Sequence, residues 1–173
     1  VFPYPMGYQV GMFVLDEVKG QDIRVLFFPG PKNSLWAPKT FNGFTAAFKE
    51  QAEKRPVGKV TIAAEQYGAL SHKRQRKLVE YLLDAKEDID YIIGNPIMAI
   101  EASYVLENFK EKHTKAKIIS TYLLPEVYKR IQEGKIHASI AESPVEQGQI
   151  AVDMVLEIIA GKKPGIKEDK LPF

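Results

Sequence analysis

The sequence predicts a three-layer α/β/α fold with a mostly parallel sheet, and two observations support this prediction. Short apolar, β-branched runs alternate with longer segments whose apolar residues recur at helical spacing. Strands and helices that alternate in this way form parallel sheets with helices on both faces, joined by right-handed crossovers. The chain has 173 residues, 45% of them apolar and 27% charged, which suffices for one globular domain with its own core.

The first half of the chain supplies three predicted helices and two predicted strands. Phe41, Phe44 and Phe48 fall at helical spacing and form one buried face, and Pro56 disfavours helix in the residue before it. Ser71 is a suitable cap for the helix that follows it. Helices are therefore expected over residues 6–18, 41–55 and 71–86, and strands over residues 23–28 and 60–64.

The second half continues the alternation with three more strands and three more helices. Pro96 suits the first turn of a helix, and Gly161 is a suitable residue for ending the last one. Strands are expected over residues 91–95, 117–120 and 136–141, and helices over residues 96–112, 125–133 and 145–160.

The charge distribution does not favour nucleic-acid binding. The chain has 24 basic and 22 acidic residues, a net charge of +2. The one basic run, His72–Lys77, opens a predicted helix. It could form a phosphate-binding stripe, but a solvated helix face is the interpretation we favour.

The cysteine count excludes several chemistries. The chain has no cysteine, so disulfides, thiolate catalysis and sulfur-ligated metals are excluded. A cysteine-free chain suits an oxidising compartment such as the periplasm. No apolar run reaches the roughly 18 residues of a membrane span, so we expect no insertion into the membrane.

The inventory of reactive groups predicts no enzyme. His72, His113 and His137 lie in separate elements without the spacing of metal ligands. The sequence contains no phosphate-binding glycine loop, no dinucleotide fingerprint and no Gly-x-Ser-x-Gly elbow. We therefore expect no catalytic residues, no metal and no cofactor.

Polar and aromatic residues follow the predicted strands, at the edge where parallel sheets bind ligands. Trp36, in the loop after the first strand, either packs into the core or offers its ring to a ligand, and we favour the ligand role. Tyr67 lines a pocket or anchors its turn. Asn95 caps a helix, binds a ligand or does both. Tyr122 could form a second aromatic wall opposite Trp36.

Four segments together resemble the type 1 periplasmic binding proteins: Phe27–Pro31, Asp90–Asn95, Ile119–Pro125 and Glu142–Met154. The similarity runs over nearly the whole chain. It implies a flavodoxin-like lobe of a non-enzymatic, two-lobed clamp that closes on a small ligand.

The resemblance also assigns parts of the chain to that clamp. Residues 1–141 would be the C-terminal lobe, residues 142–162 a hinge-crossing helix returning toward the first lobe, and residues 163–173 a tail. The sheet of the first lobe would lie outside this chain. The chain begins at Val1 without a methionine or a signal-like segment, so we expect it to be a processed or trimmed piece of a longer protein.

The resemblance implies that Trp36, Asn95 and Tyr122 contact the ligand and that Ser143 lies by the hinge. It is strongest to family members that sense trimethylamine N-oxide in the periplasm and present their closed state to a membrane histidine kinase. Aromatic walls and a hydrogen-bond donor suit this methylated, strongly accepting molecule. The expected partners are therefore a small ligand and the periplasmic domain of a sensor kinase.

Other functions on the same fold remain open. A sugar-binding component of an ABC transporter would need more Asp, Asn and Arg residues at the strand ends than are present here. The effector lobe of a LacI-type regulator would carry a helix-turn-helix, which this chain lacks. A flavodoxin-like enzyme or response domain is disfavoured by the lack of a phosphate loop and an acidic cluster. Surface left by the missing lobe predicts a homodimer.

Overall fold

The computed structural model describes residues 3–54, 56–108 and 115–163. The chain divides into two compact units, Val1–Ile140 and Ala141–Phe173. The assignment of these parts to a lobe, a hinge-crossing helix and a tail stays a prediction, and residues 164–173 of the predicted tail lie outside the described residues.

Strands and helices alternate along the first unit, as the sequence predicts. The strands are β1 (Ile23–Phe28), β2 (Val60–Glu65), β3 (Tyr91–Gly94), β4 (Lys117–Ser120) and β5 (Ala138–Ser139). The helices are α1 (Pro3–Val18), α2 (Ala37–Ala52), α3 (His72–Ala85), α4 (Pro96–Asn108) and α5 (Pro125–Gln132). The second unit holds α6 (Pro144–Ile159).

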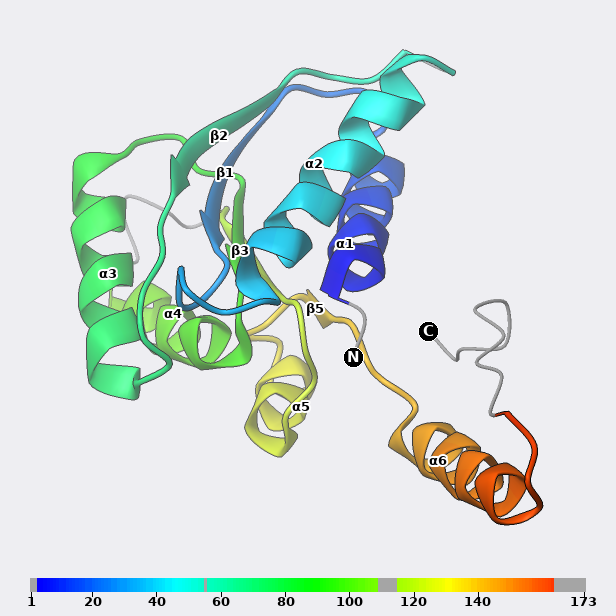
Figure 1. Ribbon diagram of the computed structural model, residues 1–173. Helices are drawn as coiled ribbons and strands as arrows, with labels where there is room; N and C mark the ends of the chain where they lie inside the picture. The colour runs from blue at the N-terminus through cyan, green and yellow to red at the C-terminus, as the bar shows by residue number, and fades with distance from the viewer. Residues whose placement is uncertain (1–2, 55, 109–114, 164–173) are drawn as a thin grey trace. The chain divides into compact units, whose positions relative to one another are not determined.

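The five strands form one parallel sheet in the order β2-β1-β3-β4-β5, which confirms the predicted fold class (Figure 1). In this order the chain runs from β1 outward to β2 and then returns to the other side of β1. The carboxyl ends of β1 and β3 therefore meet at the point where the direction of winding changes. In open α/β sheets this is where a ligand-binding crevice opens.

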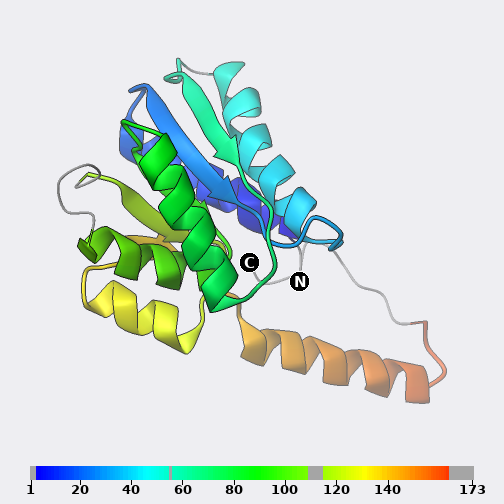
Figure 2. The ribbon, with the colours of Figure 1, turned by 90° about the vertical axis from the view of Figure 1, so that its left-hand side faces the viewer.

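Each face of the sheet has its own apolar core, because successive side chains of a buried strand point to opposite faces. Val25 and Phe27 of β1 pack with α1 and α2. Leu26 and Phe28 pack on the other face with α3, α4 and α5. Figures 1 and 2 show these two helical layers on either side of the sheet.

Several predicted boundaries differ from those observed. The last strand was expected over residues 136–141 but is only Ala138–Ser139, because it is an edge strand that pairs with β4 alone. The second helix ends at Ala52, and its predicted end near Arg55 lies outside the described residues, as does the predicted helix end near Lys112. The cap at Ser71 is confirmed, since its side chain accepts a hydrogen bond from the backbone of Arg74.

Helix α6 has no buried residue within the described part of the chain. Its exposed apolar side chains include Val152, Val155 and Ile159. Among the described residues, no helix is both long enough and apolar enough to span a membrane.

Candidate ligand-binding site

A pocket of about 350 Å³ opens at the carboxyl edge of the sheet. Its walls come from the segments that follow β1, β2, β3 and β4, and from the starts of three helices. The lining residues are Met6, Trp36, Thr40, Leu70, Pro96, Thr121 and Tyr122. The pocket thus lies where the strand order predicts a ligand crevice.

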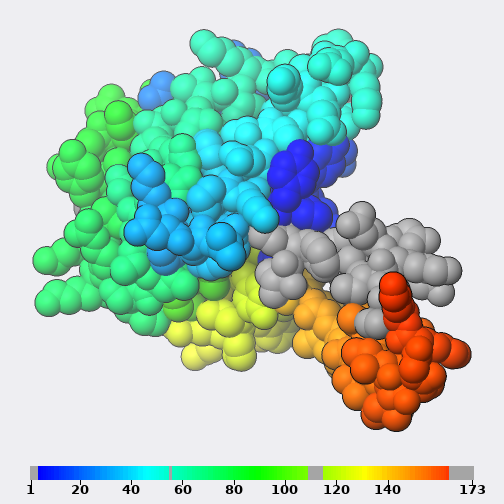
Figure 3. Space-filling view, in the orientation of Figure 1, coloured from blue at the N-terminus to red at the C-terminus, as the bar shows by residue number. Residues whose placement is uncertain are grey.

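Trp36 forms the wall after β1. Its indole is half-buried, and the ring lies against the backbone of Gly30, where an added Cβ would stand 2.5 Å from Cη2 of Trp36. Gly30 has a φ of 127°, a conformation that favours glycine. The loop therefore holds the ring by a close approach that only glycine permits at this position. Figure 3 shows this loop, in light blue, at the surface of the first unit.

Thr121 and Tyr122 form the wall after β4. The Thr121 hydroxyl donates to the carbonyl of Gly94, 3.2 Å away, and the Ser120 hydroxyl donates to the carbonyl of Tyr122 at 2.7 Å. These bonds fix the backbone that carries the Tyr122 ring. The structure thus brings Trp36 and Tyr122 to one pocket, and their contact with a ligand stays a prediction.

Three lining residues lie in the first turns of helices: Met6 in α1, Thr40 in α2 and Pro96 in α4. Sequence reasoning missed Met6 and Thr40 as pocket residues. A usable signal was present, because a helix that precedes or follows a parallel strand begins at the carboxyl edge of the sheet. The three helix starts direct positive dipole ends toward this region.

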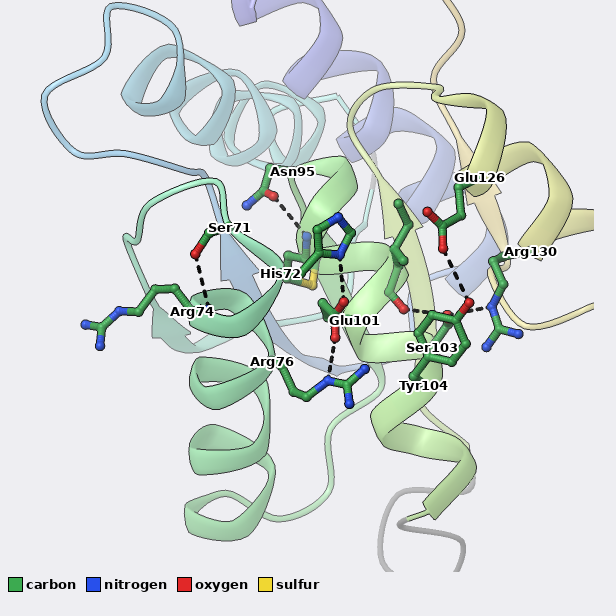
Figure 4. Close-up of polar contacts among 12 residues, drawn as sticks. Ser71, His72, Arg74, Arg76, Asn95, Glu101, Ser103, Tyr104, Glu126 and Arg130 are labelled. Carbon is green, nitrogen blue, oxygen red and sulfur yellow. Dashed lines mark hydrogen bonds and ion pairs between the residues drawn. The ribbon is translucent and has the colours of Figure 1, made fainter.

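Asn95 lies directly after β3 and is fully buried. Its Oδ1 accepts a hydrogen bond from the backbone of Met98 at 2.9 Å (Figure 4), and its Nδ2 donates to the carbonyl of Phe28 at 3.2 Å. Asn95 therefore caps α4 and ties its start to the end of β1, as one of its two predicted roles requires. The direct ligand contact expected of Asn95 stays a prediction.

Tyr67 and Ser143, the other predicted site residues, are not among the lining residues of this pocket. The Tyr67 hydroxyl donates to Oε1 of Glu65 at 2.5 Å. Burial, together with the hydrogen bond to Glu65 and its charge, raises the pKa of Tyr67 to about 12. Ser143 belongs to the second unit, where its carbonyl accepts the backbone N–H of Gln147 at the start of α6. Ligand-binding roles for both residues stay predictions.

A buried carboxylate on α4 neutralises part of the basic helix α3. Oε1 of Glu101 lies 2.7 Å from Nδ1 of His72, and its Oε2 accepts from Nε of Arg76 at 2.5 Å (Figure 4). The Glu101 side chain is only 5% exposed, whereas the side chains of His72 and Arg76 are half-exposed. This cluster joins α3 to α4.

Within the described residues, no three His, Asp or Glu side chains gather in a way that could hold a metal ion.

A second ionic cluster lies at the amino edge of the sheet, opposite the pocket. Glu17, near the end of α1, accepts hydrogen bonds from Nζ of Lys117, from the Tyr91 hydroxyl at 2.9 Å and from Nε2 of His137 at 2.9 Å. Burial alone would raise the pKa of Glu17, but these hydrogen bonds outweigh it and hold the pKa below its ordinary value. The cluster therefore secures the far end of the helix whose start carries Met6.

Comparison with known proteins identifies the family. The sequence matches the family described as the periplasmic binding protein domain over residues 3–163. It is 30% identical over 159 residues to the periplasmic protein TorT of Escherichia coli strain K12, covering 92% of this chain and 44% of TorT. The chain thus spans about half the length of the curated relatives it matches.

Solved structures share the fold. An ABC transporter solute binding protein from Bradyrhizobium sp. BTAi1 with bound bis-tris matches with a TM-score of 0.81 and 30% identity, covering 94% of this chain and 47% of that one. TorT in complex with the TorS sensor domain, in the presence of TMAO (trimethylamine N-oxide), matches with a TM-score of 0.74 and 20% identity, covering 95% and 52%. Because the family match extends over most of its length, this chain belongs to the periplasmic binding protein domain family.

Proposed function

We propose that this protein senses trimethylamine N-oxide in the periplasm and presents its ligand-bound, closed state to the periplasmic domain of a sensor histidine kinase. The observation that carries the proposal is the pocket at the carboxyl edge, where the described lining residues include two aromatic side chains and no charged one. The similarity of this chain to TorT supports the assignment of ligand and partner.

The lining of the pocket favours a small ligand with apolar methyl groups and no net charge. Trp36 and Tyr122 offer aromatic faces, which attract methyl groups on a positively polarised nitrogen. Met6 and Leu70 add apolar surface. An ion with uncompensated charge would lose its hydration here without gaining a charged partner from the part of the lining that the structure describes.

The helix starts around the pocket favour an oxygen that carries negative charge. Each helix start is equivalent to about half a positive charge, and α1, α2 and α4 all contribute lining residues from their first turns. In trimethylamine N-oxide the nitrogen suits the aromatic walls and the oxygen suits the helix starts. The two requirements of the pocket are thereby met within one neutral molecule.

A role in solute transport is the second candidate. It is supported by the 30% identity to the Bradyrhizobium ABC transporter protein. A sugar would need many hydrogen-bonding partners, yet the Thr40 and Thr121 hydroxyls already donate to the carbonyls of Trp36 and Gly94. The polar lining of this lobe therefore fits a hydroxyl-rich ligand less well than it fits the N-oxide.

Signalling would follow from a population shift. A ligand that binds the closed state more tightly than the open state moves the equilibrium toward closure, and a kinase that distinguishes the two states reads the shift. Sedimentation of the full-length protein with the kinase's periplasmic domain, with and without the N-oxide, measures that difference. Equal affinity in both conditions would contradict the signalling mechanism.

Isothermal titration of the full-length protein with trimethylamine N-oxide and with D-ribose tests the ligand. We expect the N-oxide to bind and ribose not to. Trp36→Ala removes a cation–π contact of about 1–2 kcal/mol, so the Kd should rise about 5- to 30-fold, and Trp36→Phe should lose less. Tyr81→Ala is the matched control, because Tyr81 is a 67% exposed aromatic on α3 outside the pocket lining. Absence of N-oxide binding would reject the proposed ligand, and unchanged affinity in Trp36→Ala would remove Trp36 from the site.

A further inference from the structure

Gln75 is a buried amide in the first turn of a helix whose neighbouring side chains face solvent. It is 1% exposed, although it stands within the basic run His72–Lys77, whose other five residues are exposed. A solvated basic face therefore does not account for this residue. Its surroundings indicate what it does instead.

The Gln75 side chain holds the loop between β2 and α3. Its Nε2 donates to the carbonyl of Ala69 at 2.8 Å and to the carbonyl of Gly68 at 3.3 Å. Because carbonyls only accept hydrogen bonds, the amide must present its nitrogen to them. Its Oε1 is buried without a hydrogen-bond partner among the described residues. A buried acceptor without a hydrogen bond destabilises the fold, so the two hydrogen bonds that Nε2 donates to the loop must offset this cost.

This loop is joined directly to the loop that supports Trp36. The backbone N–H of Gly68 donates to the carbonyl of Gly30 at 2.9 Å. Gly30 in turn lies against the indole ring of Trp36. The same β2–α3 loop continues to Leu70, which lines the pocket. Two walls of the pocket therefore depend on one hydrogen-bonded connection.

We infer that Gln75 is a positioning residue for the ligand pocket, which holds the Leu70 wall through Gly68 and Ala69 and the Trp36 wall through Gly68 and Gly30. It acts without being among the residues that line the pocket. The effect on ligand affinity rests on the proposed function, whereas the effect on the Trp36 ring does not.

The test uses the full-length protein labelled with 5-fluorotryptophan, with the Trp36 signal assigned by its loss in Trp36→Phe. Gln75→Met keeps the length of the side chain and removes both donors. Ser103→Ala is the matched control, because Ser103 is another buried polar residue, bonded to the carbonyl of Ile100 and to Arg130 between α4 and α5. Each variant is studied by fluorine NMR without ligand, by urea unfolding and by titration with trimethylamine N-oxide.

Gln75→Met should shift or broaden the Trp36 fluorine signal. It should also raise the Kd for the N-oxide about two- to tenfold, because the β2–α3 loop and the Trp36 side chain must then become ordered when the ligand binds, and this ordering costs free energy. Ser103→Ala should lower stability and leave both readouts as in the wild type. An unchanged Trp36 signal in Gln75→Met would overturn the inference. A change of equal size in Ser103→Ala would also overturn it, because the effect would then follow stability alone.

The role of Gln75 can still be tested if the wild type does not bind the ligand or if Gln75→Met does not fold. If the wild type does not bind the N-oxide, the ligand proposal fails while the fluorine comparison still decides the role of Gln75. If Gln75→Met does not fold, hydrogen exchange of the wild type decides, since the Gly68 amide should exchange slowly while it is bonded to Gly30. Exchange at the rate of an unprotected amide would show that the loops are not joined, and would overturn the inference.

Discussion

Replacing Gly30 with alanine should alter the pocket through the Trp36 ring. Gly30 has a φ of 127°, and an alanine held there costs about 1–3 kcal/mol of backbone strain. The new Cβ would stand 2.5 Å from Cη2 of Trp36, 3.1 Å from Cζ3 and 3.2 Å from Cζ2. Ordinary carbon contacts begin near 3.5 Å, so the ring must move by about 1 Å.

The displacement of the ring should be visible separately from the loss of stability. Gly134→Ala is the matched control: its φ is 68°, and no atom lies within 4 Å of the Cβ that would be added. That variant should lose about 1–2 kcal/mol from the backbone alone. Gly30→Ala should lose at least as much, because the displaced ring adds to the backbone strain. It should also shift the Trp36 fluorescence and weaken binding of the N-oxide.

Urea unfolding measures the free energy of unfolding of both variants, and titration measures their Kd values. If Gly30→Ala lowers stability yet leaves the Trp36 emission and the Kd as they are in Gly134→Ala, then the ring does not rest on Gly30. The geometry derived for this wall would then be refuted.

Two further predictions concern Arg130 on α5, which bonds Ser103 and pairs with Glu107 and Glu133, and the Glu17 cluster at the amino edge of the sheet. Unfolding experiments measure both. Arg130, 6% exposed, bonds Ser103 and pairs with glutamates that are over a third exposed, so Arg130→Met should cost about 2–3 kcal/mol, less than the loss of a fully buried pair; a loss below the error of the measurement would contradict this. The pKa of Glu17 is lowered in the folded state, so its contribution to stability is complete above the ordinary glutamate pKa and is lost as pH falls through the folded value. The difference in stability between wild type and Glu17→Gln should therefore shrink with acidification, and a difference that is constant with pH would be inconsistent with the cluster.

The sheet and its helices were predictable because their signals are local. Buried parallel strands appear as short β-branched runs, and Phe41, Phe44 and Phe48 mark a helix face by spacing alone. The cap at Asn95 was foreseen for the same reason, since proline follows it directly. The short strand β5 was overestimated because an edge strand pairs on one side only, and apolar sequence does not reveal where pairing ends.

The pocket was only partly predictable because its parts meet in three dimensions. Trp36 and Tyr122 follow strands, so the rule for parallel sheets placed them at one edge. The alternation of strands and helices also places the starts of α1 and α2 at this edge, but which first-turn side chains line the pocket, here Met6 and Thr40, depends on how these helices pack on the sheet. The role of Gln75 could not be predicted, because it lies within a basic run of the sequence and only its burial in the structure distinguishes it from the exposed residues around it.

The central claim is that trimethylamine N-oxide binds against Trp36 at the carboxyl edge of the sheet. The most direct test is to record nuclear Overhauser effects between the N-methyl protons of the ligand and the assigned ring protons of Trp36 in the full-length protein. We predict clear effects that disappear when unlabelled N-oxide is replaced by its perdeuterated form. Binding of the N-oxide without any effect at Trp36, or no binding at all, would contradict the account.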